Sequence, residues 1–225
     1  VSRSFTEGAP VAAATRARIL KVAARLGYQR NHLASGLTTG RTRLVALILD
    51  EGAGAEELRL MAAVARGLEA EGLRPLLVHL PAGRDARAAL RPLREHPVEA
   101  AVLISAAVHP AVARALHAAG VAVVQVLAPQ PAQPDGALVS VSEVGAGREA
   151  ARLLLARGYR GGTEAGGWTG IGLTTLAPPQ EEMAEATVAL ALGAIRGDGG
   201  TERVRRFDCR LVERGTLRPP RPRPS

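Results

Sequence analysis

From residue 44 onward the chain alternates short apolar runs with amphipathic stretches, and this alternation constrains its fold more than any other feature. The apolar runs are rich in Val, Leu and Ile with little polar alternation, which is typical of strands buried on both faces. They comprise Leu44–Leu49, Pro75–Leu80, Val98–Ile104, Val121–Leu127 and Ala137–Val141. Helical patterns follow them at about residues 55–71, 84–95, 109–119 and 144–158. This order predicts an α/β fold with a parallel, doubly wound sheet.

Glycines mark the ends of several of these elements. Gly72, Gly120 and Gly158 follow three predicted helices, where a left-handed C-terminal cap is expected. Residues 161–172 contain six glycines and no apolar run, which indicates a loop or linker. Beyond it we expect a strand at 173–176, a helix at about 180–195 that covers the same sheet, and a last strand at 204–212 that lacks partner strands.

The first 42 residues show no strand pattern. Residues 13–26 place Ile19, Ala23 and Leu26 on one face of a helix, and a second short stretch, Asn31–Thr38, follows. This part of the chain is therefore predicted to be a small helical unit joined by a short link to the α/β body.

The basic residues are concentrated at the two ends of the chain. Residues 1–43 hold eight basic residues against Glu7 alone, a net charge of +7. Residues 201–225 carry +5 and the stretch between carries −4, within a total of +8. A basic head on an acidic body is typical of a protein that binds an anionic polymer. A solvated helical surface without such a partner explains the charge alone equally well.

Signals for export, membrane insertion and disulfide bonding are missing from this sequence. No run of eighteen apolar residues occurs and no charged-then-apolar leader opens the chain, so neither a membrane span nor an export signal is expected. Cys209 is the single cysteine, which excludes an intrachain disulfide and favours a cytoplasmic protein.

The motifs that would indicate an enzyme are incomplete. The glycine pairs at 52 and 54 and at 145 and 147 lack the third glycine of a dinucleotide fingerprint. His109 and His117 have no acid or cysteine cluster beside them, so no metal site is expected. Ser105 lacks the G-x-S-x-G elbow of a serine hydrolase. We therefore predict a protein that is not an enzyme and uses no cofactor.

Several stretches of the basic head match one family. The chain supplies Val1-Ser2-Arg3, Thr15-Arg16-Ala17-Arg18-Ile19-Leu20 and Leu26-Gly27-Tyr28, then Asn31, Ala34, Leu37 and Arg41-Thr42. At these spacings the residues resemble the LacI/GalR (lactose-repressor) family of transcription regulators. The resemblance implies a partial helix-turn-helix head with a hinge helix over residues 1–42, and operator DNA as its partner.

The same resemblance assigns the DNA contacts. It implies that the DNA-binding residues are Ser2, Arg3, Thr15, Arg16, Asn31, Ala34 and Leu37. Their chemistry suits the task, because an arginine fork such as that of Arg3 reads guanine in the major groove. Thr15, Asn31 and the arginines can donate to phosphates, which fixes register without reading sequence. Leu37 suits a wedge between base steps in the minor groove, or else a packing anchor between head and body.

The head departs from the family pattern at its helix ends. Ala12 stands where the family usually has a capping Ser, and Ala13 where it usually has Pro. Losing such a cap costs about 1 kcal/mol, and Gly36 in the hinge helix costs about 1 kcal/mol relative to alanine. The family's first helix and the start of its recognition helix have no counterpart in this sequence. We therefore expect the head to fold and bind poorly on its own.

The body resembles the family's type I periplasmic-binding-protein-like domain from Leu44 to Arg160, with Ser142-Glu143 in place of Asp-Asn. The resemblance implies an effector-binding and dimerisation lobe over residues 43–200, with most of the C-terminal lobe missing near 161–170. Residues 201–225 are expected to be a strand remnant and a disordered tail. The candidate effector-binding residues are Glu51, Ser105 and Gln125. A cleft with a single wall is not expected to enclose a ligand on two sides.

The sequence is compatible with two functions. The first is a repressor of transcription, complete or degraded, that binds operator DNA as a homodimer under control of a small effector such as a sugar or sugar acid. The second is a binding module for a sugar-type molecule without a working DNA head. The basic segment 1–43 favours the first, and the missing first helix favours the second.

Overall fold

The chain forms two compact units, Val1–Thr42 and Arg43–Ser225. The computed structural model describes residues 2–5, 10–28, 41–80, 86–104, 110–128, 136–157, 174–198 and 203–213. In the first unit, the 3-10 helix η1 spans Ser2–Phe5 and helix α1 spans Ala13–Arg25. The predicted stretch Asn31–Thr38, the loop at 161–172 and the tail from residue 214 lie outside the described residues.

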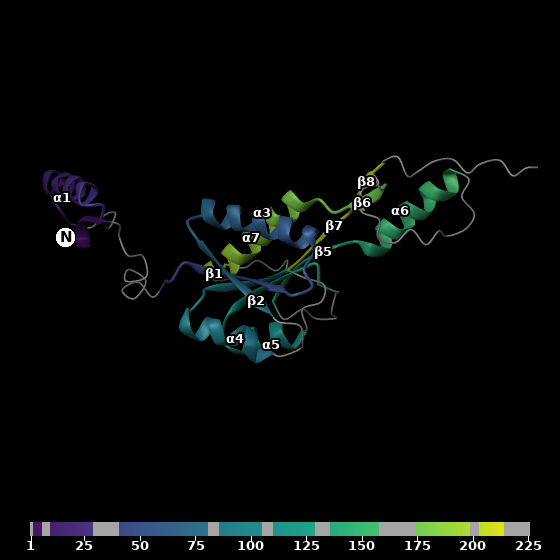
Figure 1. Ribbon diagram of the computed structural model, residues 1–225, viewed down its shortest axis with the longest axis horizontal. Helices are drawn as coiled ribbons and strands as arrows, with labels where there is room; N and C mark the ends of the chain where they lie inside the picture. The colour runs from purple at the N-terminus through teal and green to yellow at the C-terminus, as the bar shows by residue number, and fades with distance from the viewer. Residues whose placement is uncertain are drawn as a thin grey trace, which may run out of the picture. The chain divides into compact units, whose positions relative to one another are not determined.

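The second unit is built on a six-stranded parallel sheet in the order β2-β1-β3-β4-β5-β7 (Figure 1). Its strands are β1 (Leu44–Asp50), β2 (Arg74–Leu80), β3 (Ala100–Ile104), β4 (Ala122–Val126), β5 (Ala137–Val141) and β7 (Val204–Phe207). Its helices are α3 (Ala55–Ala70), α4 (Ala86–Glu95), α5 (Pro110–Ala118), α6 (Glu143–Ala156) and α7 (Gln180–Arg196). The predicted parallel, doubly wound α/β fold is confirmed.

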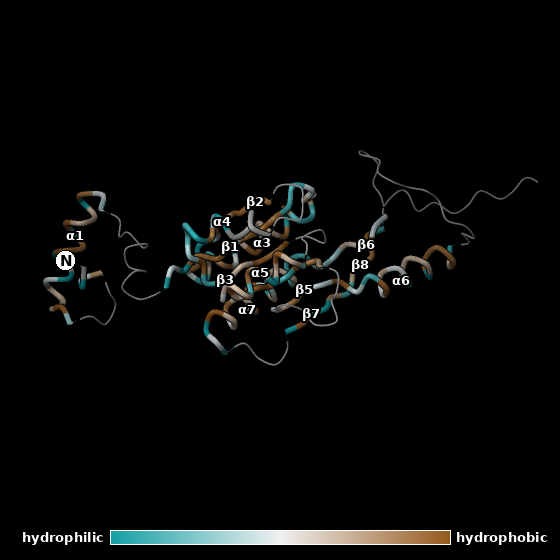
Figure 2. Tube along the Cα trace, turned by 90° about the horizontal axis from the view of Figure 1, so that it is seen from below, coloured by the Kyte–Doolittle hydropathy of each residue, from teal (hydrophilic) through white to brown (hydrophobic). Residues whose placement is uncertain are grey.

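Helices cover both faces of the sheet (Figure 1). On one face α3 and α7 pack over strand residues such as Val45 and Val102. On the other face α4 and α5 pack over Ile48 and Leu103. Because β1 and β3 lie between the two layers, their side chains are buried on both sides, and the strands are coloured as apolar segments in Figure 2. This double burial explains the unbroken apolar runs in the sequence.

Helices α3 and α5 end at the glycines that the sequence predicts. Gly72 has a φ of +74° and Gly120 a φ of +79°, the left-handed conformation that glycine adopts without strain. Beyond α3, the N–H of Leu73 donates to the carbonyl oxygen of Leu68 at 2.9 Å. This bond satisfies one of the last carbonyls of the helix. Gly158 lies outside the described residues.

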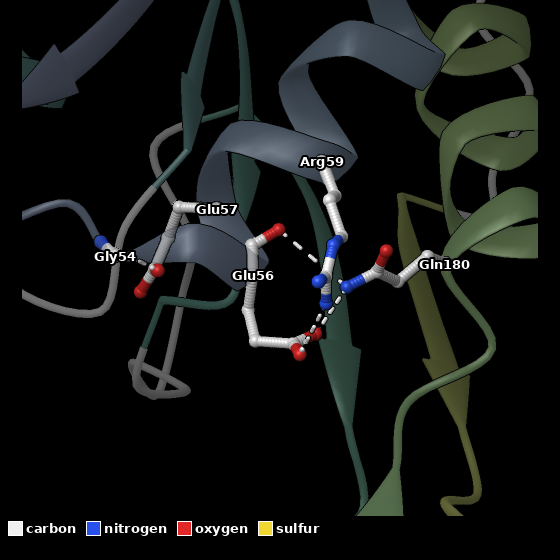
Figure 3. A network of polar contacts seen from close by, with 5 residues as sticks. All are labelled: Gly54, Glu56, Glu57, Arg59 and Gln180. Carbon is white, nitrogen blue, oxygen red and sulfur yellow. Dashed lines mark hydrogen bonds and ion pairs between the residues drawn. The ribbon is translucent and has the colours of Figure 1, made fainter. Parts of the chain in front are cut away.

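A polar network joins the beginnings of α3 and α7 (Figure 3). The side-chain amide of Gln180 donates to the backbone oxygen of Glu56 at 3.5 Å and also to its carboxylate. Arg59 forms an ion pair with the same carboxylate at 3.2 Å. Farther along, a Cβ on Gly67 would lie 2.9 Å from a methyl carbon of Val188, so the two helices are in close contact. As predicted, α7 covers the same sheet, and it does so in the helical layer that also contains α3.

The prediction for residues 204–212 is wrong in two respects. The run forms two strands, because the chain leaves the sheet at Asp208 and Cys209. Both strands are paired, β7 in parallel with β5, and β8 (Arg210–Val212) antiparallel with β6 (Thr175–Ala177). The expected lack of partner strands is therefore incorrect.

Helix α6 forms where it is predicted, but it does not cover the sheet. None of its residues is buried. In Figures 1 and 2 it extends away from the strands, beyond the end of β5. The sequence pattern predicted this helix correctly, but it did not indicate that the helix lies apart from the sheet.

Candidate DNA-binding head and effector edge

The described part of the first unit carries only positive charge. Its charged side chains are those of Arg3, Arg16, Arg18, Lys21, Arg25 and Arg41, and over these described positions it contains no Asp or Glu. Arg18, Lys21 and Arg25 follow one another at helical spacings of three and four residues, so they share one face of α1, and all three are exposed. Such a face can contact successive phosphates of a nucleic acid.

Contacts at the end of α1 hold η1 against it. Gly27 has a φ of +62°, and the N–H of Tyr28 donates to the carbonyl oxygen of Ala23 at 2.9 Å. The ring of Tyr28 lies 5.5 Å from that of Phe5 at an interplanar angle of 50°. At the other end, Ala12 makes no side-chain capping bond, as its sequence predicts. The cost of that missing cap is about 1 kcal/mol.

The structure places some of the predicted DNA-binding residues. Arg3 is exposed in η1, and Thr15 is exposed on α1 beside the basic face. Arg16 is half-buried and already has an interaction partner. Ser2 lies in η1, with no description of its side chain, whereas Asn31, Ala34 and Leu37 lie outside the described residues. The predicted set does not include Arg18, Lys21 and Arg25. Their helical spacing alone predicts that they form one basic face.

In the second unit, the carboxyl ends of the parallel strands form the edge where ligands bind in open α/β sheets. The sheet order reverses between β1 and β3, so the turn after β1 lies at the preferred position. In that turn the carboxylate of Asp50 accepts the N–H of Gly52 at 2.8 Å, and that of Glu57 accepts the N–H of Gly54 at 2.9 Å. Glu51 lies between them and is exposed.

Of the three predicted effector residues, the structure describes Glu51 and Gln125. Gln125 is only 7% exposed and lies in β4, in register with Leu103 of β3 and Leu138 of β5. It also has an interaction partner. Ser105 lies outside the described residues.

A small cavity of about 220 Å³ opens at the carboxyl ends of β4, β5 and β7. Leu127, in its wall, has a φ of +62°, a conformation that is costly for a side chain of this size and is enriched at functional positions. The polar side chains of the wall are Ser140, Ser142, Glu143 and Arg206. Hydroxyl, carboxylate and guanidinium groups are suited to a polyhydroxylated or acidic ligand. The family pattern drew attention to Ser142 and Glu143, but nothing in the sequence pointed to Ser140 and Arg206.

The thiol of Cys209, which follows β7, is not in its reactive form. Cys209 is half-buried. Burial raises the pKa of its thiol, and the charges of Asp208 and Glu143 raise it further. The thiolate needed for nucleophilic attack is thus disfavoured.

Over the described ranges, no group of three His, Cys, Asp or Glu side chains could hold a metal ion. Over the same ranges, no helix is long and apolar enough to cross a membrane.

Comparison with solved structures identifies proteins that share the fold of this chain. No family model and no curated protein matches its sequence. Among solved structures, the Lac repressor dimer bound to operator and the anti-inducer ONPF matches with a TM-score of 0.73 and 14% identity, over 94% of this chain and 92% of that one. The regulator CelR in complex with cellobiose matches with a TM-score of 0.60 and 16% identity, over 94% and 93%.

A third structure has a higher sequence identity. A LacI-family regulator from Silicibacter pomeroyi is 26% identical, with a TM-score of 0.53, over 92% of this chain and 59% of that one. These neighbours are transcription regulators, and the matches show a fold that this chain shares with them. The chain therefore has the fold of the LacI/GalR family of repressors.

Proposed function

We propose that this protein is a transcriptional repressor that binds operator DNA as a homodimer and responds to a small-molecule effector. The observation that carries the proposal is a separate, strongly basic unit attached to a repressor-type α/β lobe. The Lac repressor neighbour is a dimer bound to operator DNA and an anti-inducer, and CelR is bound to cellobiose. On this basis the protein is a regulator rather than an enzyme.

In this proposal the head divides its contacts between bases and phosphates. Ser2 and Arg3 reach base edges in the major groove, and Thr15 and Arg16 contact phosphates together with the basic face of α1. In the sequence resemblance, Asn31, Ala34 and Leu37 belong to the hinge and complete the site. The homodimer then presents two heads, so its operator has two-fold symmetry.

Selection of duplexes from a random library by the full chain tests this function. We expect an enriched sequence with two inverted half-sites, one helical turn or a multiple of it apart, because the symmetry of the site mirrors that of the dimer. A library that remains random after several rounds, with the protein folded by circular dichroism, would leave the alternative of a binding module without a working head.

Arg3→Ala is expected to reduce sequence discrimination rather than general DNA affinity. A bidentate arginine–guanine contact is worth about 1–3 kcal/mol, so affinity for the selected site falls about 5- to 150-fold. Affinity for random DNA changes little. Arg25→Ala is the matched control, because Arg25 is an exposed residue on the basic face of α1 and should weaken both duplexes equally. Equal losses for Arg3→Ala on both duplexes would make Arg3 a phosphate contact.

For the effector, we propose a sugar or sugar acid bound at the carboxyl edge of the sheet. Glu51, Ser105 and Gln125 are the contacts that the sequence predicts, and Ser140, Ser142, Glu143 and Arg206 are the polar side chains of the cavity at this edge. Because the cavity found at this edge is only about 220 Å³ and is open, we expect dissociation constants weaker than about 1 μM. Calorimetric titration of the full chain with cellobiose and with gluconate measures them. Submicromolar binding of either ligand would show that the site is more enclosed than the single lobe allows.

A further inference from the structure

A long trough lies between α7 and β7. It measures about 990 Å³ and extends from the amino ends of β4 and β5, at Ala122 and Ala137, along β7 to Phe207. Small-ligand sites reach about this volume. Among the described residues, the trough shares no lining residue with the cavity of about 220 Å³ at the carboxyl edge. It is therefore a separate place where a ligand could bind.

The charged groups of the trough are divided between its two sides. Over the described lining, the carboxylates belong to α7 or to the residues just beyond its end, namely Glu182, Glu185 and Asp198. The guanidinium groups of Arg203 and Arg205 belong to β7 or directly precede it. His117, at the end of α5, also lines the trough. Because the two signs come from different elements, the trough favours a ligand that carries both charges.

Two of these charged groups are available to a ligand. Glu182 already pairs with Arg210, and Arg205 has an interaction partner of its own. Within the described part of the chain, Glu185 and Arg203 form no ion pair, and both residues are exposed. Glu185 can therefore accept hydrogen bonds from an ammonium group, and Arg203 can donate two to a carboxylate.

The surface between these charges is apolar. Ala186 and Leu190 of α7 and Phe207 of β7 are half-buried, and Ala189 of α7 is exposed. Apolar groups of a ligand gain free energy when they cover such a surface and displace water from it. This lining favours a ligand with apolar side chains over a polyhydroxylated one.

We propose that the trough binds short peptides that have free termini and apolar side chains. The terminal ammonium group lies beside Glu185, and the terminal carboxylate lies beside Arg203. Because these two residues form no ion pair, their charged atoms are more than 4.0 Å apart. A peptide spans such a gap with its backbone, whereas a free amino acid carries both charges on one carbon. The proposal concerns a site other than the carboxyl edge and does not depend on DNA binding.

Titration of the full chain with alanyl-leucyl-alanine, followed by its amide NMR signals, tests this site. We expect a dissociation constant of about 0.1–1 mM, because the trough is open. The largest shifts should occur in α7 and β7. N-acetylation or C-amidation of the peptide removes one terminal charge, and each should weaken binding about three- to tenfold. Triglycine keeps both charges without apolar side chains and should bind at least about fivefold more weakly.

Two outcomes of this titration would overturn the proposal. One is the absence of saturation up to about 10 mM peptide, a concentration well above the expected dissociation constant. The other is a set of shifts confined to the carboxyl ends of the strands.

Paired variants assign each terminus to its partner. Glu185→Gln should weaken binding of the free peptide about three- to tenfold without affecting the acetylated peptide, which lacks the ammonium group. Arg203→Gln should weaken the free peptide to a similar extent without affecting the amidated peptide. Glu181→Gln and Arg66→Gln are matched controls, because these residues form an exposed ion pair between α7 and α3 and do not line the trough. All four residues are exposed, so circular dichroism should remain unchanged. Equal losses for free and modified peptides, or losses with the control variants, would contradict the assignment.

Discussion

Leu60→Ala is expected to lower the free energy of unfolding by about 2–5 kcal/mol. Leu60 lies on α3, is 1% exposed, and packs in the apolar layer between α3, α7 and the sheet. Truncation removes its buried methyl groups and leaves a cavity that the packed neighbours only partly fill. Urea unfolding of the full chain, followed by circular dichroism, measures the change.

The same helix provides a matched control. Leu58 is two residues away on α3 and is 48% exposed, so Leu58→Ala has the same helix propensity change without the cavity. We expect it to change the free energy of unfolding by less than about 1 kcal/mol. Equal effects at the two positions would mean that α3 does not pack on the sheet through Leu60.

Raising the salt concentration from about 50 to about 200 mM is expected to weaken DNA binding several-hundredfold. The first 43 residues carry a net charge of +7. If about five of these charges contact phosphates, the slope of log affinity against log salt is roughly −4.5. Fluorescence anisotropy with a labelled duplex at several salt concentrations gives the slope. Affinity that stays constant over this range would show that the basic head does not neutralise phosphates.

Much of the α/β lobe could be predicted from the sequence, because buried strands consist mainly of apolar residues. The five apolar runs correspond to β1–β5 within two residues. Strands in the interior of the sheet are covered on both faces and therefore contain few polar residues. Gly72 and Gly120 end their helices because each position needs a positive φ.

Which strands pair with one another is harder to predict from the sequence. The segment 204–212 has the composition of one strand, but pairing with β5 and with β6 divides it at Asp208 and Cys209. Helix α6 has an apolar face, and periodicity predicts such a face without indicating what covers it. One of the contacts at its end joins Arg157 with Glu213, 56 residues away.

In the candidate sites, too, features set by neighbouring residues could be predicted, whereas contacts between residues far apart in the sequence could not. The basic face of α1 follows from spacing alone, because Arg18, Lys21 and Arg25 recur with the helical period. The small cavity joins Ser140 of β5 with Arg206 of β7, which come together only through the pairing of those two strands. No local pattern predicts that contact.

The most direct measurement compares DNA binding by the full chain and by residues 43–225 alone, a unit that contains its own apolar core. Fluorescence anisotropy at low salt, with the duplex selected by the full chain, is the readout. If residues 1–42 are the DNA-binding head, their removal should weaken binding at least about a hundredfold while circular dichroism shows the α/β lobe still folded. Undiminished affinity of the lobe alone would contradict the account, because DNA binding would then belong to the lobe and not to the basic head.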